Sequence, residues 1–256
     1  MQAHQQATTQ QFDPQAQAYL TSAVHAAGPD LAQACQLLAA NVAGHARALD
    51  VGCGAGHLAF QLAPLLGHIT ALDPAPAMLD TVAASAASRG LNNLATQSGH
   101  AGALPFADAS FALVASRYSA HHWLDLAAGL ADMRRVTAPG GYVLLIDVQA
   151  PEDALADTHL QCWELLRDRS HVRNRSDREW RELFAASGIE LIAHHSWPLR
   201  LEFASWVARM RTPPEKVALL RQLQQEAPQE VASALQLEAD GSFSTATGLW
   251  WGRVPA

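Results

Sequence analysis

Short apolar runs alternate along the chain with segments in which apolar residues recur every three or four positions. A short apolar run bounded by turn residues is typical of a buried strand, and the three-to-four spacing is typical of a helix with one buried face. Because strands alternate with helices, they should form a parallel sheet covered on both faces. The strands are predicted at 47–51, 68–73, 94–98, 111–116, 142–148 and 189–197, with a last one through Trp250 and Trp251.

The pattern before the first strand is polar and then helical. Residues 1–11 are rich in Gln and His and are expected to be mobile. Helices are predicted at 13–28 and at 30–44, each closed by a glycine. Since both precede the first strand, they should cover one side of the sheet or the edge where its ligand binds.

The second half of the chain is less regular. Pro139-Gly-Gly141 predicts a tight turn before the fifth strand, and Ser176 should cap a helix with Glu179 as its capping-box partner. Residues 202–239 form a helical insertion before the last strand, with apolar residues at helical spacing from Phe203 to Met210. We expect this insertion to close over the active edge as a hydrophobic roof.

A glycine-rich loop joins the first strand to the helix that follows it. Gly52, Gly54 and Gly56 leave no side chains in the way, so a ligand can lie across the amides that open the helix. Asp50 precedes them by two residues; it would repel a pyrophosphate and attract a cation, by about 4 kcal/mol at ~4 Å and an effective dielectric near 20. S-adenosylmethionine fits this site because it is a nucleoside with an ammonium, a sulfonium and no phosphate.

Asp73 ends the second strand, about 20 residues after the glycines. A doubly wound sheet places at this point an acid that accepts hydrogen bonds from both ribose hydroxyls. The alternative is that Asp73 only caps the next helix.

The composition and net charge of the chain limit the kinds of molecule that it can bind. The 256 residues are about half apolar and carry a net charge of -7, with no block of Lys or Arg, so binding to nucleic acid is not expected and the acceptor should be small. Three scattered cysteines, a polar N-terminus and the lack of a long apolar run favour the cytoplasm without stable membrane insertion. Cys53, inside the glycine loop, fits better as a small residue than as a nucleophile. The oligomeric state stays open.

Four motifs together identify a family resemblance over residues 47–148. They are Leu-Asp-Val-Gly-Cys-Gly-Ala-Gly at 49–56, Asp73, Ala-Leu-Pro-Phe-Ala-Asp-Ala-Ser-Phe at 103–111, and Pro-Gly-Gly at 139–141. The chain resembles class I S-adenosylmethionine-dependent methyltransferases, most closely the type 11 group of ubiquinone/menaquinone-biosynthesis enzymes and an uncharacterised bacterial branch within it. The resemblance implies a Rossmann-like α/β fold with a seven-stranded sheet of order 3-2-1-4-5-7-6, strand 7 antiparallel.

The length predicts a single domain at 1–256, and the order of motifs divides it, while the resemblance implies residue roles. The N-terminal helices at 12–44 precede a cofactor-binding core at 45–150, and residues 151–256 form a substrate-side region. His100 stands where relatives commonly carry Asp, and its neutral imidazole could accept the bond from the adenine amino group. The cofactor-binding residues implied are Asp50, Gly52, Cys53, Gly54, Gly56, Asp73, Pro74, Met78, His100, Ala101 and Ser116.

Methyl transfer needs alignment of donor and acceptor, and a base only if the acceptor must lose a proton. His121, His122 and Tyr118 follow the fourth strand and are the candidate catalytic residues, although each histidine could instead cap or pack. No metal site is expected, because no carboxylate accompanies the histidine pairs at ligand spacing. The candidate substrate residues are Tyr19, Trp163, Arg173 and Trp206.

We therefore expect an S-adenosylmethionine-dependent methyltransferase that acts on a small, apolar or aromatic molecule. The alternatives are a nicotinamide-dependent oxidoreductase, which Asp50 and the glycine spacing disfavour, and a catalytically silent S-adenosylmethionine-binding protein. Methylation of nucleic-acid amino groups is disfavoured, because Ser116-Arg-Tyr-Ser replaces the Asn/Asp-Pro-Pro-aromatic motif of those enzymes.

Overall fold

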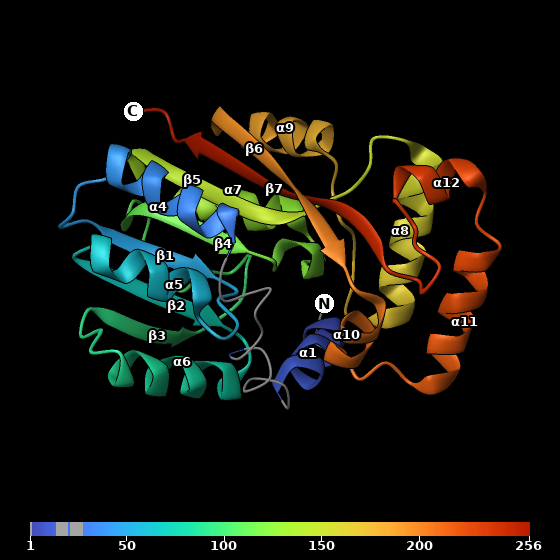
Figure 1. Cartoon of the computed structure of the whole chain (residues 1–256). Helices are drawn as coiled ribbons and strands as arrows, with labels where there is room; N and C mark the ends of the chain where they lie inside the picture. The colour runs from blue at the N-terminus through green and yellow to red at the C-terminus, as the bar shows by residue number, and fades with distance from the viewer. Residues whose placement is uncertain (1, 14–19, 21–27) are drawn as a thin grey trace.

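The computed structural model describes residues 2–13, 20 and 28–256 (Figure 1). The helix predicted at 13–28, together with Tyr19, therefore lies almost wholly outside the described residues. Residues 1–11 are predicted to be mobile from their composition, and the structure places residues 2–12 in the helix α1 (Gln2–Phe12). The helix has a one-sided pattern: His4, Thr8 and Phe12, four residues apart, all line one cavity.

A seven-stranded sheet organises the chain, in the order β3-β2-β1-β4-β5-β7-β6. β7 runs antiparallel to both of its neighbours, and the other pairs are parallel. The sheet order implied by the family resemblance is thus confirmed. The strands are β1 (Arg47–Val51), β2 (His68–Asp73), β3 (Leu94–Ser98), β4 (Phe111–Arg117), β5 (Thr137–Gln149), β6 (Glu190–Leu201) and β7 (Phe243–Arg253).

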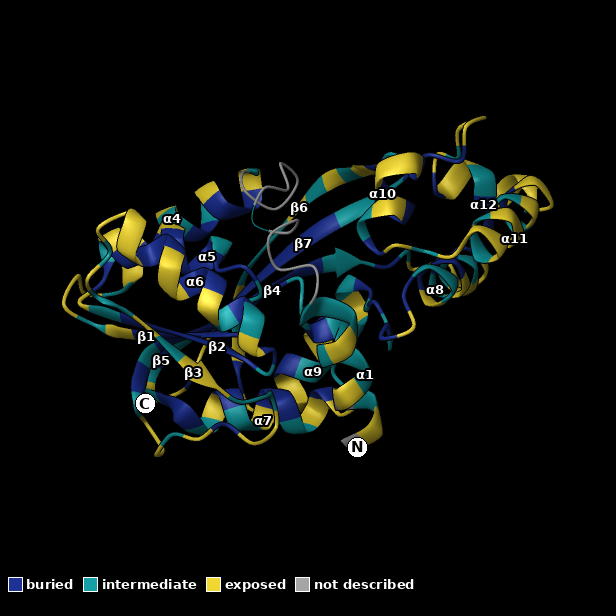
Figure 2. Cartoon of the chain, turned by 90° about the horizontal axis from the view of Figure 1, so that it is seen from below, coloured by how far each residue is buried: buried dark blue, intermediate teal, exposed yellow. Residues whose placement is uncertain are grey.

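Alternate residues of each strand face opposite sides, and helices cover both (Figure 2). In β5, Leu144 and Ile146 belong to the core under one set of helices, whereas Val143 and Leu145 belong to the core under the other. The first set is α4 (Pro29–Asn41), α5 (His57–Leu62) and α6 (Pro76–Ser88). The second is α7 (Leu126–Val136) and α9 (Asp177–Ala186).

A third core lies beyond the sheet, in a helical lobe made by α8 (Ala154–Arg167), α10 (Phe203–Arg209), α11 (Pro214–Gln225) and α12 (Gln229–Ala234) (Figure 1). Trp163, Trp206, Leu220 and Phe243 are buried in it. The 202–239 insertion thus hides its apolar face against α8 and the start of β7. The predicted roof is corrected in extent: α11 and α12 pack within the lobe, whereas α10 also reaches a cavity at the active edge through Trp206 and Arg209.

The Pro139-Gly-Gly141 segment is part of β5 rather than a turn before it. Its residues bulge out of the ladder, since Phe111 pairs with Thr137 and Leu113 already pairs with Tyr142. Gly140 takes a φ of +77°, which suits glycine. Among the described residues no helix combines the length and apolarity needed to cross a membrane.

The predicted capping box is present at the start of α9. Ser176 Oγ accepts from the Glu179 amide, and Glu179 Oε2 accepts from the Ser176 amide at 2.9 Å. Ser176→Ala should therefore lower the free energy of unfolding by about 1 kcal/mol, and Tm by about 2 to 4 °C, measured by circular dichroism. Ser187→Ala at the far end of α9 is the control, and an equal loss there would contradict the role of the cap.

Candidate active site

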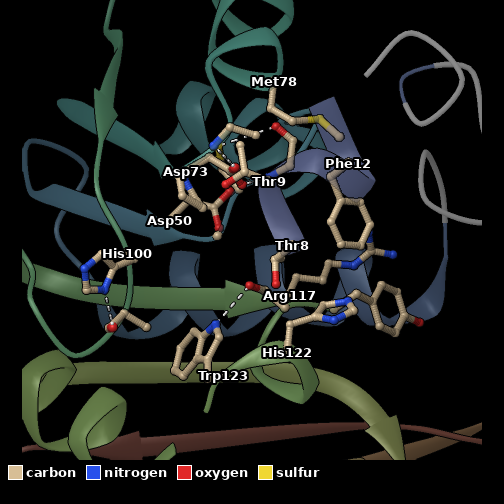
Figure 3. A pocket seen from close by; sticks show the side chains of 18 of the residues that line it. Thr8, Thr9, Phe12, Asp50, Asp73, Met78, His100, Arg117, His122 and Trp123 are labelled. Carbon is tan, nitrogen blue, oxygen red and sulfur yellow. Dashed lines mark hydrogen bonds between the residues drawn. The ribbon is translucent and has the colours of Figure 1, made fainter. Parts of the chain in front are cut away.

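The main cavity opens at the carboxyl edge of the sheet, beside β1, β2 and β4, and has a volume of about 400 Å³ (Figure 3). β1 lies between β2 and β4, so this is the point at which the order of the strands reverses. The volume lies within the range of small-molecule sites. The glycine loop, the segments at 100–103 and 117–125, and α1 form its walls.

The backbone fixes the glycine loop. The amides of Gly52 and Cys53 both donate to the carbonyl oxygen of Leu72, at 2.8 and 3.0 Å, and turn the chain away from β1. Gly52, Gly54 and Gly56 all have positive φ, and a Cβ on Gly52 would lie 1.9 Å from the Ser119 hydroxyl. Other residues would therefore strain or block the loop, which leaves its backbone open to a ligand.

Asp50 lies in the wall of this cavity and is 1% exposed. Neither of its carboxylate oxygens has a hydrogen-bond partner among the described residues. Burial raises the pKa of Asp50 to about 7, and the Ala59 amide and the charge of Arg117, both beyond hydrogen-bond distance, offset this only in part. A buried carboxylate without a partner is costly, so the position suits a cationic ligand that would pair with it.

Asp73 is held at the end of β2 by two backbone amides. Its Oδ2 accepts from Gly54 and its Oδ1 from Ala75, both at 2.9 Å. Burial raises its pKa to about 6. Each carboxylate oxygen keeps a second lone pair, so Asp73 both fixes the glycine loop and can accept from a ligand, while Met78 is buried in the adjacent wall.

His100 and Ala101 line the far end of the cavity. The Nδ1 atom of His100 lies 2.9 Å from the Ala101 carbonyl oxygen. Because that oxygen can only accept, Nδ1 carries the proton and Nε2 is the acceptor. The structure therefore leaves His100 able to accept from a ligand amino group.

Ser116 does not line the cavity. It is buried, and its hydroxyl donates to the Val51 carbonyl oxygen at 2.7 Å between β4 and β1. The predicted cofactor role of Ser116 is therefore corrected to a link between strands. The cavity wall is made by the residues that follow it, from Arg117 to Ser119.

Tyr118 has a φ of +51°, and its hydroxyl lies 2.7 Å from the Thr247 hydroxyl. Burial raises the pKa of Tyr118 to about 12, so it stays protonated at neutral pH. A phenol with that pKa is a poor general base. Tyr118 lines the cavity as a wall residue.

His121 and His122 lie side by side after β4, with ring centroids 4.1 Å apart. His121 Nδ1 lies 2.5 Å from Asp147 Oδ1, and His122 Nδ1 lies 3.0 Å from the Ser170 carbonyl oxygen. Burial opposes the charge on His121, but the charge of Asp147 and its hydrogen bond outweigh this effect and raise the pKa. Burial and the charge of His121 lower the pKa of His122 to about 4.

A second cavity of about 80 Å³ adjoins the first, and Phe12, Tyr118 and His122 line both. Its other walls come from the ends of β5 and β6, from α8 and α10, and from Asn174. His121 faces this second cavity. The two cavities together could hold two ligands end to end, with the histidine pair where they meet.

Comparison with known proteins decides the family. The sequence profile described as "Methyltransferase domain" matches residues 49–145. The chain is 42% identical over 194 residues to the uncharacterized protein YafE of Escherichia coli, which covers 76% of this chain and 94% of that one. It is 34% identical over 205 residues to the uncharacterized methyltransferase YcgJ of Bacillus subtilis, 80% of each chain. The chain belongs to this methyltransferase family.

The crystal structure of YcgJ agrees, with a TM-score of 0.84 at 30% identity over 89% of this chain and 98% of that one. The protein is therefore a methyltransferase with the Rossmann-like fold of class I enzymes. A demethylmenaquinone methyltransferase of Chlorobaculum parvum is 34% identical over 106 residues, but these cover only 41% of this chain and 42% of that one.

Two of the residues predicted to bind the methyl acceptor lie elsewhere in this methyltransferase. Trp163 is fully buried in the helical lobe, with its ring 5.3 Å from that of Phe243. Arg173 pairs with Asp157 at 2.7 Å and with Glu179, and lines neither cavity. These two predictions are corrected: Trp163 is a core residue, and the Arg173 guanidinium already has two carboxylate partners.

Trp206 lines the second cavity while contributing to the core of the lobe. Sequence reasoning missed the residues that α1 brings to the main cavity, which are His4, Thr8, Thr9 and Phe12. Their spacing along a helix was the available signal. It also missed Asn174.

Among the described residues, no three or more His, Cys, Asp or Glu side chains are placed to hold a metal ion.

Asp50→Asn should weaken cofactor binding and stabilise the free protein. The pKa of Asp50, about 7 in the fold, exceeds that of an exposed aspartate, about 4. Its charge therefore destabilises the fold increasingly between about pH 4 and 7. The variant should show a higher Tm, by about 2 to 4 °C for each kcal/mol recovered, with the largest gain at pH 8. Its affinity for S-adenosylmethionine, measured by calorimetry, should fall at least about tenfold, as for a lost charge-assisted contact.

Asp80→Asn, at an exposed position on α6, is the matched control and should change neither quantity. An unchanged Tm at pH 8 together with wild-type cofactor affinity in the Asp50 variant would refute the role of this carboxylate.

Proposed function

We propose that this methyltransferase uses S-adenosylmethionine and transfers its methyl group to a small, largely apolar or aromatic molecule. The observation that carries the proposal is the unpartnered carboxylate of Asp50 beside the glycine loop. It suits the ammonium of the methionine moiety and would repel a phosphate. The three cysteines, all free thiols, support action in the reducing cytoplasm.

The residues around Asp50 suit the rest of this cofactor. The Asp73 carboxylate can accept from both ribose hydroxyls, and Met78 can pack beside the nucleoside. His100 Nε2 can accept from the adenine amino group, next to the Ala101 backbone. When bound, the cofactor supplies a methyl group activated by sulfonium. The chain's own part is to hold donor and acceptor in line, about 3 Å apart, and to exclude water.

The N-terminal helix α1 is the cover that excludes water. Thr8, Thr9 and Phe12 project from it into the main cavity, opposite the glycine loop (Figure 3). The Nε2 atom of His4 lies 3.2 Å from the carbonyl oxygen of His122, which ties α1 to the histidine pair. We propose that α1 closes the reaction site with α10 beside it: the Gln11 side chain donates to the Met210 carbonyl oxygen at 3.1 Å, and Trp206 lines the second cavity.

We assign different roles in proton transfer to the two histidines. When the surroundings move the pKa values of two neighbouring groups apart, the group with the lower pKa is free to accept a proton and the group with the higher pKa can donate one. His122 is neutral at pH 7. Since its Nδ1 faces the Ser170 carbonyl, Nε2 is the atom that can take the acceptor's proton, and the Asp168 carboxylate, 4.0 Å from Nε2, would stabilise the charge gained. His121, whose pKa Asp147 raises, can instead donate to an oxygen of the acceptor.

The lining of the main cavity favours an apolar acceptor. Leu58, Phe12, Trp123 and Leu124 supply apolar surface. The net charge of -7 and the lack of a basic patch do not favour a polymeric anion. A small planar molecule that slips between α1 and the histidine pair fits this arrangement.

His122→Gln should lower turnover about 10²-fold or more with cofactor affinity unchanged, because a general base acts only in the transition state. His121→Gln is the matched control: it should reduce turnover less and shift the pH dependence of turnover. Steady-state kinetics between pH 5 and 9, with calorimetry of S-adenosylmethionine binding, would measure both. Near wild-type turnover of His122→Gln would show that the reaction takes no base from this residue.

The proposed function is tested directly with methyl-labelled S-adenosylmethionine. The protein is incubated with the labelled cofactor and cell extract, and the molecule that acquires the methyl group is identified by mass spectrometry. A labelled small molecule that is absent with Asp50→Asn supports the proposal. Binding of NAD in place of S-adenosylmethionine, or label found only in nucleic acid or protein, would overturn it.

A further inference from the structure

Asn174 has an amide side chain without a hydrogen-bond partner. It is 1% exposed, lies in the loop between α8 and α9, and lines the second cavity. Neither its Nδ2 nor its Oδ1 atom finds a partner among the described residues. Leaving a buried donor or acceptor unpaired costs about 1–3 kcal/mol each. A fold that keeps both unpaired beside a cavity has a binding group ready for a ligand.

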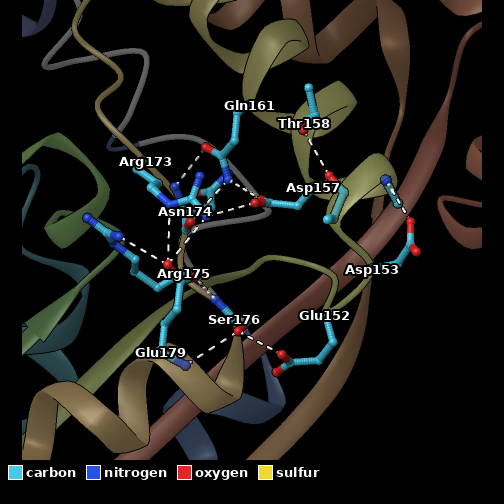
Figure 4. Close-up of polar contacts among 12 residues, drawn as sticks. Glu152, Asp153, Asp157, Thr158, Gln161, Arg173, Asn174, Arg175, Ser176 and Glu179 are labelled. Atoms are coloured by element: carbon cyan, nitrogen blue, oxygen red, sulfur yellow. Dashed lines mark hydrogen bonds and ion pairs between the residues drawn. The ribbon is translucent and has the colours of Figure 1, made fainter.

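The backbone of Asn174, in contrast, is fully held (Figure 4). Its amide donates to Gln161 Oε1, and its carbonyl oxygen accepts from Gln161 Nε2, both at 3.0 Å. Gln161 is itself fixed, because Nε2 also donates to Asp157 at 2.7 Å and Oε1 lies 2.9 Å from His171 Nε2. The side-chain amide thus projects from an anchored backbone.

Ion pairs on either side of Asn174 hold the same loop. Arg173 pairs with Asp157 at 2.7 Å, and Arg175 pairs with Glu179 at 3.1 Å (Figure 4). The Arg175 carbonyl oxygen accepts from the Ala150 amide at 3.0 Å, which joins the loop to the end of β5. Binding groups held in this way lose little freedom when a ligand arrives.

The charged groups of the second cavity balance. Glu164 and Asp168 line it with Arg167 and Arg209, and Arg167 pairs with Glu164 at 2.8 Å. His121 also lines it and is paired with Asp147. A charged ligand would therefore meet both signs of charge with no excess of either. The cavity therefore suits a neutral polar group.

A neutral partner that satisfies both atoms of an amide must present one acceptor and one donor side by side. A carboxylate would leave Oδ1 unpaired. A carboxamide would satisfy both atoms, but its nitrogen is a poor nucleophile, whereas a hydroxyl beside a carbonyl is an enol or phenol that can be activated for methylation by loss of a proton. The histidine pair lies at the same cavity to take that proton.

We propose that the second cavity binds the polar head of the methyl acceptor, a hydroxyl beside a carbonyl, and that Asn174 recognises this pair. The inference rests on the proposed function. Nδ2 donates to the carbonyl oxygen, and Oδ1 accepts from the hydroxyl when the acceptor binds. Before methyl transfer the hydroxyl turns its one proton from Oδ1 to Nε2 of His122, which takes it, while Nδ2 keeps its bond to the carbonyl oxygen. The rest of the acceptor passes Phe12 and His122, which line both cavities, into the space beside the cofactor site.

Binding of small probes tests the proposal without turnover. Maltol carries a hydroxyl beside a carbonyl, its O-methyl ether lacks the donor, and 4-pyranone lacks the hydroxyl. Their affinities are measured by calorimetry with the protein saturated by S-adenosylhomocysteine. The wild-type protein should bind maltol at least about tenfold more tightly than either analogue, and Asn174→Leu should abolish that preference.

Asn174→Asp, which keeps the shape and removes the Nδ2 donor, should lose the preference as well and guards against a folding defect in the Leu variant. Asn92→Leu, exposed at the opposite edge of the sheet, is the matched control and should keep it. Equal affinities for the three probes in the wild type, or a preference kept in both Asn174 variants, would overturn the proposal. S-adenosylmethionine affinity, measured on the same samples, reports separately on the proposed function.

Discussion

A buried carboxylate without a partner is the constraint on which the site depends. Asp50 lies near the end of the inner strand β1, with β2 and β4 on either side. No described group lies within hydrogen-bond distance of its oxygens, and burial raises its pKa more than the Ala59 amide and the charge of Arg117 lower it. The sheet must therefore be stable enough to keep such a group in place. Two apolar cores, one on each face, supply that stability, and a cationic ligand would remove the penalty.

The burial of Asp50 also explains the glycine loop that follows β1. The chain must turn away directly after β1 so that it does not cover Asp50. It turns there because the amides of Gly52 and Cys53 both donate to the Leu72 carbonyl oxygen. Asp73 fixes the glycine loop in this position, because its carboxylate accepts from the Gly54 amide at the cavity. Asp50 and Asp73 thus line one cavity, and the charge of Asp73 adds to burial in raising the pKa of Asp50. A cation bound between the two carboxylates would lower the pKa of both.

The sequence predicted those parts of the structure that depend on local pattern. The glycine loop, Asp73 and the capping box of Ser176 are each specified within a few residues, and the sheet order came with the family resemblance. Trp163 and Trp206 could not be told apart, because both sit at helical spacing and only the packing of the lobe decides which reaches a cavity. α1 was missed because it is polar, so its position depends on contacts with segments distant in sequence.

Asn174 shows a further limit, because an asparagine in a polar loop carries no sequence signal of its own. Its importance depends on Gln161, whose side chain hydrogen-bonds both the amide and the carbonyl oxygen of Asn174. The Asn174 side chain then lines the cavity without a partner of its own. The histidines follow the same logic. His121 and His122 are identical neighbours, yet His121 Nδ1 bonds the Asp147 carboxylate, whereas His122 Nδ1 faces a neutral carbonyl and its Nε2 is 4.0 Å from the nearest carboxylate, that of Asp168. Only one of two rings 4.1 Å apart can readily carry a charge, so the partner of each ring, and not its identity, makes one a donor and the other a base.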